Sequence, residues 1–273
     1  MANTRLNSMT QQEEKNFFGS NPVLRNIKKS VGKDSGTEVA SYKGITLKSL
    51  IFLAMILVGV VLASIIHSLN YQTIYLGEDI FATVPELIGS LVSAVLLLIL
   101  SIVCIFLKKT IPFFGSLYCI SFGYLYTSMA NLFNGYREAI LLAIVVTLSI
   151  FAAVVFAYMN GKIRVTSKFR QGVTVAIAAL VISSVVIAIG FLIPGLKEIS
   201  IFVATNPLLC IVFSIIGIII ATLSLVKDVD TIHQLVENKI SAKFEWKAAF
   251  SLIFSLVWIF VEVLRLILAF KDN

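Results

Sequence analysis

The chain has 273 residues and a net charge of +7; 58% of its residues are hydrophobic and only 14% are charged. Soluble domains are about half apolar and a quarter charged, and one soluble core could not bury this excess of apolar surface. The composition therefore excludes an ordinary soluble domain and indicates a membrane protein. The basic residues lie in links beside apolar runs rather than in one patch, which argues against a nucleic-acid partner.

Residues 1–43 precede the first apolar run and form a polar tail rich in Asn, Ser, Gln, Lys and Glu. Such a composition does not supply enough apolar surface to fold, so the sequence predicts a flexible tail. The tail is also too long for the basic region of a cleavable signal peptide, so the apolar run that follows should remain as a helix. We therefore divide the chain into a flexible cytoplasmic tail, 1–43, and a transmembrane domain, 44–273.

Seven apolar segments follow, each near the roughly 20 residues that a helix needs to cross a hydrocarbon core about 30 Å thick. They cover residues 45–69, 87–107, 113–134, 138–160, 171–194, 206–227 and 247–270. The breaks between them hold charges or turn residues, and Pro112, Pro194 and Pro207 fall at or near helix ends. The predicted fold class is an all-α integral membrane protein with seven transmembrane helices.

The charges of the links alternate along the chain. The tail and the links before the third, fifth and seventh segments are basic, whereas the links before the second, fourth and sixth segments are acidic or balanced. The positive-inside rule therefore places the tail and the basic links in the cytoplasm. An odd number of crossings then puts the C-terminus on the outside.

Glu262 and Arg265 interrupt the last apolar segment, 247–270, close to its middle. Each costs very roughly 2.5–3.5 kcal/mol at the centre of a membrane helix, so this helix inserts at near break-even when alone. A helix that needs neighbours belongs inside the bundle. The two residues share one helix face, so Glu262 is placed to pair with Arg265, although Arg265 is also close enough to the outer end to reach water.

A second group of polar residues, in LVKDVDTIHQL, ends the sixth segment. Asp228 and Asp230 are two positions apart and therefore face opposite sides of a helix. We expect Asp228, which follows Lys227, to be the solvated acid, and Asp230, with His233 one turn further on, to look into the bundle. An ordinary polar helix end is the alternative for both acids.

Glu86 and Glu138 lie at predicted outer helix ends. They are expected to be interface residues, and an outer vestibule for cations is the alternative. No catalytic or metal motif is present: the chain has only two histidines and three widely spaced cysteines, and it lacks GxSxG, HExxH and P-loop patterns. We therefore expect no enzyme and no permanently bound cofactor.

Three stretches resemble the bacterial branch of the Bax inhibitor family of seven-helix membrane proteins: SNPVLRN at 20–26, GKIRVTSKFRQGV at 161–173, and residues 225–268. The resemblance implies a multi-pass protein of the bacterial cell (inner) membrane, with six helices around a central seventh. It also implies a pH-sensitive calcium leak that is closed by one carboxylate on helix six and one on helix seven. These carboxylates share a proton and map onto Asp230 and Glu262.

Two carboxylates in a low-dielectric site do not both ionise cheaply, so a shared proton would hold the two helices together at low pH. Their oxygens also suit calcium, which makes Asp230 and Glu262 the candidate metal ligands, and calcium, protons and the lipid bilayer the expected partners. Asp228 offers a second acid on helix six, and Arg265 competes with Asp230 for Glu262. Two other functions stay open: a non-conducting regulator that binds other membrane proteins, and a proton-coupled transporter of a small solute.

Overall fold

The computed structural model describes residues 38–69, 74–75, 81–82, 84–106, 110–132, 136–161, 165–191 and 193–271. Most of the predicted tail, 1–43, lies outside these residues. The helices are α3 (Tyr42–Leu69), α4 (Val84–Phe106), α5 (Ile111–Leu132), α6 (Tyr136–Met159), α7 (Ser167–Gly190), α8 (Lys197–Thr205), α9 (Pro207–Glu237) and α10 (Glu245–Lys271). A short 3-10 helix, η1 (Ala242–Phe244), precedes α10, and the strands β1 (Ile74–Tyr75) and β2 (Phe81–Ala82) form an antiparallel pair.

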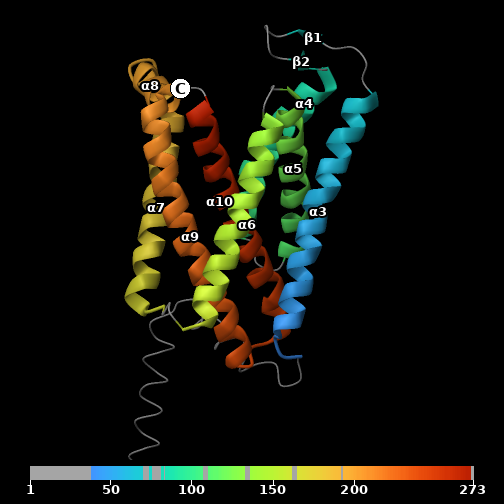
Figure 1. Ribbon diagram of the computed structural model, residues 1–273, viewed down its shortest axis with the longest axis vertical. Helices are drawn as coiled ribbons and strands as arrows, with labels where there is room; N and C mark the ends of the chain where they lie inside the picture. The colour runs from blue at the N-terminus through green and yellow to red at the C-terminus, as the bar shows by residue number, and fades with distance from the viewer. Residues whose placement is uncertain are drawn as a thin grey trace, which may run out of the picture.

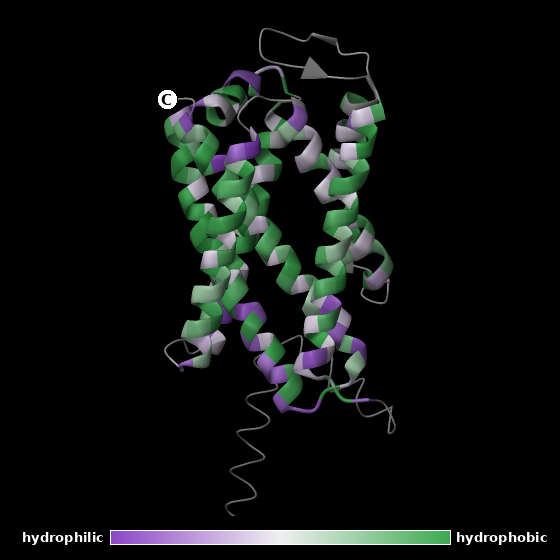
Figure 2. Cartoon of the chain, turned by 45° about the vertical axis from the view of Figure 1, so that its right-hand side comes forward, coloured by the Kyte–Doolittle hydropathy of each residue, from purple (hydrophilic) through white to green (hydrophobic). Residues whose placement is uncertain are grey.

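Six helical stretches among the described residues are long and apolar enough to cross a membrane, and they lie in α3, α4, α6, α7, α9 and η1–α10. Figure 2 shows hydrophobic residues along the length of the bundle and hydrophilic residues gathered near its two ends. These features confirm an all-α, multi-pass membrane protein. Helix α5, with 22 residues, is as long as a crossing but less apolar than the other six, so the number of seven crossings stays a prediction.

Local sequence signals set several helix ends. Thr166 caps α7 by accepting a hydrogen bond from the backbone N–H of Phe169, and Asn206 caps α9 by accepting one from Leu209. Pro207 stands in the first turn of α9, where a missing N–H does no harm. The Asn206–Pro207 pair thus separates the short helix α8, which the apolar pattern did not predict, from α9.

Helix α10 is the central helix of the bundle. It contacts α3, α5, α6 and α9, and it is the most buried of the six membrane-spanning candidates. Figure 1 shows it passing through the middle of the molecule, with α7, α8 and α9 on one side and α3, α4 and α5 on the other. The placement agrees with the expectation that the helix carrying Glu262 and Arg265 needs protein neighbours.

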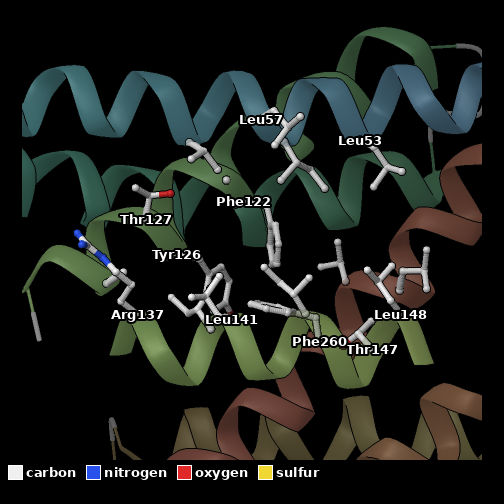
Figure 3. Close-up of a pocket in the computed structure, with 18 of the residues that line it drawn as sticks. Leu53, Leu57, Phe122, Tyr126, Thr127, Arg137, Leu141, Thr147, Leu148 and Phe260 are labelled. Atoms are coloured by element: carbon white, nitrogen blue, oxygen red, sulfur yellow. The ribbon is translucent and has the colours of Figure 1, made fainter. Parts of the chain in front are cut away.

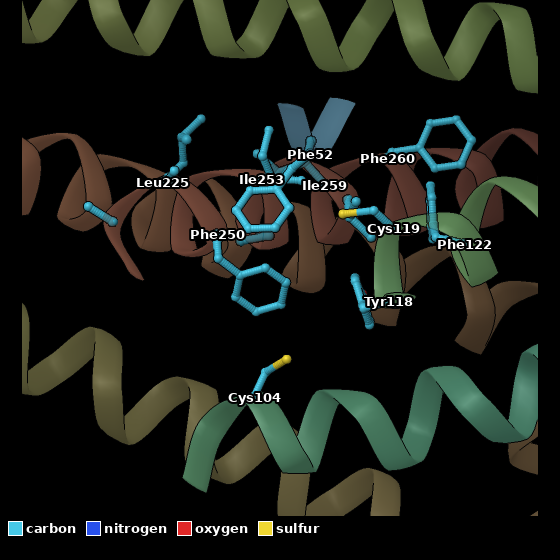
Figure 4. Close-up of a cluster of buried hydrophobic side chains, with 14 of the residues drawn as sticks. Phe52, Cys104, Tyr118, Cys119, Phe122, Leu225, Phe250, Ile253, Ile259 and Phe260 are labelled. Atoms are coloured by element: carbon cyan, nitrogen blue, oxygen red, sulfur yellow. The ribbon is translucent and has the colours of Figure 1, made fainter. Parts of the chain in front are cut away.

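A groove of about 600 Å³ opens between α3 and α6. Its floor comes from α5 and α10, and Figure 3 shows side chains of α3 and α6 on opposite sides of the opening. Deeper in the bundle, aromatic rings of α3, α5 and α10 pack edge to face: Phe52 with Phe250 at 5.5 Å, and Tyr118 with Phe250 at 5.8 Å between ring centroids (Figure 4). Such contacts add to the burial of large apolar surfaces and fix α10 against its neighbours.

At the end of the bundle where α3 begins, the chain pairs with the connection between α9 and α10. The N–H of Ala40 donates to the carbonyl of Ile240, and the N–H of Ala242 donates to the carbonyl of Glu38, both at 2.7 Å. Lys48 of α3 also forms an ion pair with Glu245 at the start of α10. We call this the α3–α10 clamp. By the charge pattern of the links, this end is the predicted cytoplasmic end.

Candidate functional site

Helices α9 and α10 form an antiparallel hairpin that sets the depth of every polar side chain between them. The chain turns back after Glu237, and Lys239 adopts a left-handed conformation with φ of 50° in the connection. In such a hairpin, side chains at equal distances from the connection meet. Ser224 of α9 accordingly lies 3.3 Å from Ser255 of α10, measured between the hydroxyl oxygens.

Asp228 faces α10, one turn closer to the connection. Ser251 donates a hydrogen bond to one carboxyl oxygen at 2.7 Å, and Ser255 donates to the other at 2.5 Å. The residue is 6% exposed, so the expectation that Asp228 is the solvated acid was wrong. Its position has a physical reason: Ser251 and Ser255, four residues apart on one face of the central helix, offer hydroxyl donors at the depth of Asp228.

We call Asp228, Ser224, Ser251 and Ser255 the hydroxyl–carboxylate site. Among the described residues, no cation forms an ion pair with Asp228. The charges of Lys227 and Arg170 act on it from a longer distance. The arrangement is a buried carboxyl group that is held between two helices by neutral donors.

Asp230 points away from α10, toward α6 and α7. Tyr158 donates to it at 2.9 Å, Gln234 donates at 2.8 Å, and the Arg170 guanidinium forms an ion pair with it. These four residues, which we call the Arg170 cluster, tie α6, α7 and α9 together near the predicted cytoplasmic end. The two acids do face opposite sides of α9, as predicted, but each is buried against a different partner.

His233 lies beside the Arg170 cluster. Its Nδ1 is 2.7 Å from the Tyr42 hydroxyl, and its ring meets the Tyr158 ring edge to face at 5.9 Å. Because Tyr158 also donates to Asp230, the histidine is linked to that acid through one side chain. The predicted grouping of His233 with Asp230 is therefore present in the structure, with Tyr158 between them.

Glu262 lies much farther along the hairpin. Trp258, one turn earlier on α10, donates its indole N–H to Glu262 at 3.3 Å, and Arg265 lies 3.4 Å away as an ion-pair partner. The Glu262 side chain also packs against Gly217 of α9, where an added Cβ would approach its carboxyl carbon to 2.7 Å. Arg265 and Asp230 were the two partners expected for Glu262, and Arg265 is the one that lies beside it in the structure.

The structure does not bring Asp230 and Glu262 together. Gly217, the α9 neighbour of Glu262, precedes Asp230 by nearly four turns, which is roughly 20 Å along the helix at 1.5 Å per residue. At that separation the two carboxylates neither share a proton nor bind one calcium ion. Within the described part of the chain, no three His, Cys, Asp or Glu side chains gather as a metal site.

Among protein families, the one described as "Bax inhibitor 1 like" matches residues 10–272 of the chain. The chain belongs to the Bax inhibitor 1-like family. No curated protein matches it significantly. Membership confirms the resemblance to the Bax inhibitor family that the three sequence stretches carry, while the bacterial branch stays a prediction.

In this Bax inhibitor 1-like protein, Glu86 and Glu138 were the residues predicted at the outer helix ends. Glu138 is exposed in the first turn of α6, while the side chain of Glu86 lies outside the described residues, so the outer vestibule stays a prediction. The pattern of ionisable residues in the sequence did not indicate the serines of the hydroxyl–carboxylate site or the partners of Asp230. A usable signal exists for the serines: Ser251 and Ser255 follow the hairpin connection at nearly the same distance by which Asp228 precedes it.

Proposed function

We propose that this protein is a pH-gated calcium leak channel and that Asp228 is its proton-responsive group. The observation that carries the proposal is the burial of Asp228 between α9 and the central helix α10, with only serine hydroxyls as hydrogen-bond partners. Family membership supports the same class of function. The proposed gate replaces the pair Asp230–Glu262, whose carboxylates are too far apart to share a proton.

The protonation state of Asp228 decides how well α9 packs on α10. A neutral carboxyl group fits a dry contact with Ser251 and Ser255, because one oxygen still accepts from a serine hydroxyl while the protonated oxygen donates to the hydroxyl oxygen of the other serine. An ionised carboxylate in the same place pays a large desolvation cost, which is relieved when water or a cation enters between the helices. Low pH therefore closes the path and rising pH opens it.

Calcium is the cation whose coordination suits the lining. Hard oxygen ligands bind it, and the hydroxyl–carboxylate site presents one carboxylate with hydroxyls of Ser224, Ser251 and Ser255. Waters would complete the six to eight ligands that calcium needs. With one carboxylate the site holds the ion weakly, as a conduction path requires.

The Arg170 cluster is proposed as a second barrier. It joins three helices beside the predicted cytoplasmic mouth, and it places an arginine charge next to the path that a cation would follow. Asp230→Asn removes the anionic partner of Arg170 and loosens the contact between α7 and α9. Calcium flux should therefore rise at every pH, while its dependence on pH remains.

Calcium flux into liposomes that contain the purified protein tests the gate, measured between pH 5 and pH 8 beside sodium and potassium flux. Asp228→Asn should flatten the pH dependence, because the amide does not ionise. Glu262→Gln is the matched control: it neutralises another buried acid of the hairpin, at a different depth, and should leave the dependence unchanged.

A flux that responds to pH equally in the wild type and Asp228→Asn would refute the gate. Flattening by Glu262→Gln instead would assign the gate to that acid. A protein without ion flux at any pH, whose cellular phenotype survives neutralisation of both acids, would favour the regulator that binds other membrane proteins.

A further inference from the structure

The groove between α3 and α6 has exposed walls and a buried floor. The walls are apolar side chains that remain open to the surroundings: Leu53 and Leu57 from α3, and Leu141, Ile144 and Leu148 from α6. The floor is made of side chains at most 8% exposed: Phe122 from α5, and Ile253, Val257 and Phe260 from α10. The groove therefore opens sideways toward lipid and ends on the central helix.

Polarity changes along the groove. At one end lie Ser64, Thr127, Asn131 and the charged lining residue Arg137, which come from α3, α5 and α6; Thr147, whose hydroxyl is buried, lies beside Leu148 at the other end. At the other end the walls are Leu53 and Leu148, and Figure 3 shows Arg137 and Thr127 at the opposite end of the groove from these two leucines. A pocket with this gradient suits an elongated amphiphile whose head lies at the Arg137 end.

The length of the groove matches half of a bilayer. Arg137 and Leu148 are three turns apart on α6, which is about 16 Å at 1.5 Å per residue. One leaflet contributes about half of the roughly 30 Å hydrocarbon core. The groove thus runs from the membrane interface, where α6 begins, to about the middle of the membrane. Its volume of about 600 Å³ lies within the range of small-ligand pockets.

The charge at the mouth selects the sign of the head group. Among the described residues no carboxylate pairs with the Arg137 guanidinium, although Glu138 follows it in the chain and is also exposed. Only Arg137 of these two lines the groove. Arg137 stands in the first turn of α6, where the free backbone N–H groups and the helix dipole also favour an anion.

We propose that the groove holds one acyl chain of an anionic phospholipid, with the head group on Arg137. The lipid fills the lateral opening between α3 and α6 and covers Phe122, Val257 and Phe260, which would otherwise face a void. The inference does not depend on the channel proposal, because its readout is bound lipid rather than ion flux.

A photoactivatable lipid tests the inference. The full-length protein is placed in neutral nanodiscs of phosphatidylcholine that contain a trace of phosphatidylglycerol with a diazirine on one acyl chain. After illumination, mass spectrometry maps the labelled residues. Phosphatidylcholine and a free fatty acid with the same labelled chain serve as parallel probes. We expect labels on the groove walls of α3 and α6, with phosphatidylglycerol about fivefold above phosphatidylcholine, since one arginine near the interface contributes about that factor.

Paired variants separate the head-group contact from the groove. Arg137→Gln should abolish the preference for phosphatidylglycerol, whereas Arg137→Lys should keep it. Lys197→Gln, at the start of α8, is the control for a lost charge. Ile144→Trp should fill the groove and lower labelling by both lipids. Leu142→Trp makes a similar change at an exposed α6 position outside the groove and should leave the labelling unchanged.

Three outcomes would overturn the proposal. If the lipid-facing side of α7 were labelled as strongly as the groove walls, the groove would not be a specific lipid site. An unchanged lipid preference in Arg137→Gln would remove the head-group contact. Stronger labelling by the free fatty acid than by phosphatidylglycerol would assign the groove to another occupant.

Discussion

Ser255 links two features of the candidate site, because its hydroxyl donates to Asp228 and also approaches Ser224. Ser255→Ala leaves one Asp228 oxygen buried without a donor. We expect a loss of roughly 1–3 kcal/mol of stability, the usual cost of an unsatisfied buried polar group. Thermal unfolding of the protein in detergent measures the change.

Ser183→Ala is the control for Ser255→Ala. This exposed serine of α7 donates only to the carbonyl of Ala179 on its own helix, so its loss should leave the unfolding temperature nearly unchanged. Equal unfolding temperatures for Ser255→Ala and the wild type would show that Asp228 does not depend on this hydroxyl.

Gly217 permits the close approach of Glu262 to α9. In Gly217→Ala the new Cβ would lie 2.7 Å from the Glu262 carboxyl carbon and 3.0 Å from its Cγ, so the side chain must move away from Trp258. We expect destabilisation on the order of 1 kcal/mol, despite the helix propensity that alanine gains over glycine.

Gly172→Ala provides a matched comparison, since nothing lies within 4 Å of the added Cβ on α7. There the helix propensity of alanine acts alone and should raise the unfolding temperature. If the unfolding temperature of Gly217→Ala rose as much as that of Gly172→Ala, the result would contradict a tight contact between Glu262 and α9.

At the scale of helices, α3 and α5 pack through two glycines. A Cβ at Gly59 would lie 2.1 Å from the carbonyl oxygen of Ile120, and a Cβ at Gly123 would lie 2.1 Å from that of Ile56. Both contacts are with backbone, which does not yield as a side chain does. Small residues allow this close packing in membrane bundles.

Substitution of either glycine should therefore push α3 from α5. Gly123→Ala is expected to cost more than Gly217→Ala, at the upper part of the range of about 1–3 kcal/mol for overpacking. Thermal unfolding again reports the effect. Since Gly123 also lines the groove, the variant should reduce lipid labelling as well. A stable, fully labelled Gly123→Ala protein would contradict the α3–α5 packing.

The apolar pattern was sufficient to predict most helices but not the depth of the polar groups. Runs such as 138–160 and 171–194 correspond to α6 and α7 within a few residues, because length and hydropathy alone select membrane helices. Helix α9 continues about ten residues beyond the predicted end, through a polar stretch. The partners of Asp228 and Asp230 on other helices stabilise that extension, and a single-helix pattern does not contain them.

The predicted contact between Asp230 and Glu262 is absent from the structure for the same reason. Periodicity tells which face a residue occupies, whereas contact between helices also requires equal depth. Asp230 lies two turns before the end of α9, whereas Glu262 lies nearly five turns after the start of α10. Counting residues from the hairpin connection would have paired Asp228 with Ser251 instead.

For the whole molecule, the first and last described helices point the same way, so the described chain starts and finishes at opposite ends of the bundle (Figure 1). This arrangement agrees with the predicted odd number of crossings, in which α5 would be the seventh. We expect Lys43→Cys and Lys271→Cys to react with a membrane-impermeant maleimide from opposite sides of the membrane.

The labelling is compared in intact and permeabilised cells, with the wild type as the control for the native cysteines, two of which are buried. Reaction of Lys271→Cys in intact cells, and of Lys43→Cys only after permeabilisation, would agree with the charge pattern. If both positions reacted from the same side, α5 would not cross the membrane.

The central position of α10 also has a consequence for biosynthesis. Of the described helices, α10 is made last, so the preceding helices enter the membrane before the surface they pack on exists. Until then, Phe52 and Tyr118 lack their Phe250 partner, and Glu245 is not yet present to receive Lys48. A message truncated before α10 would yield inserted helices without a shared core, a product that membrane quality control can recognise. The bundle therefore closes only after α10 has entered the membrane.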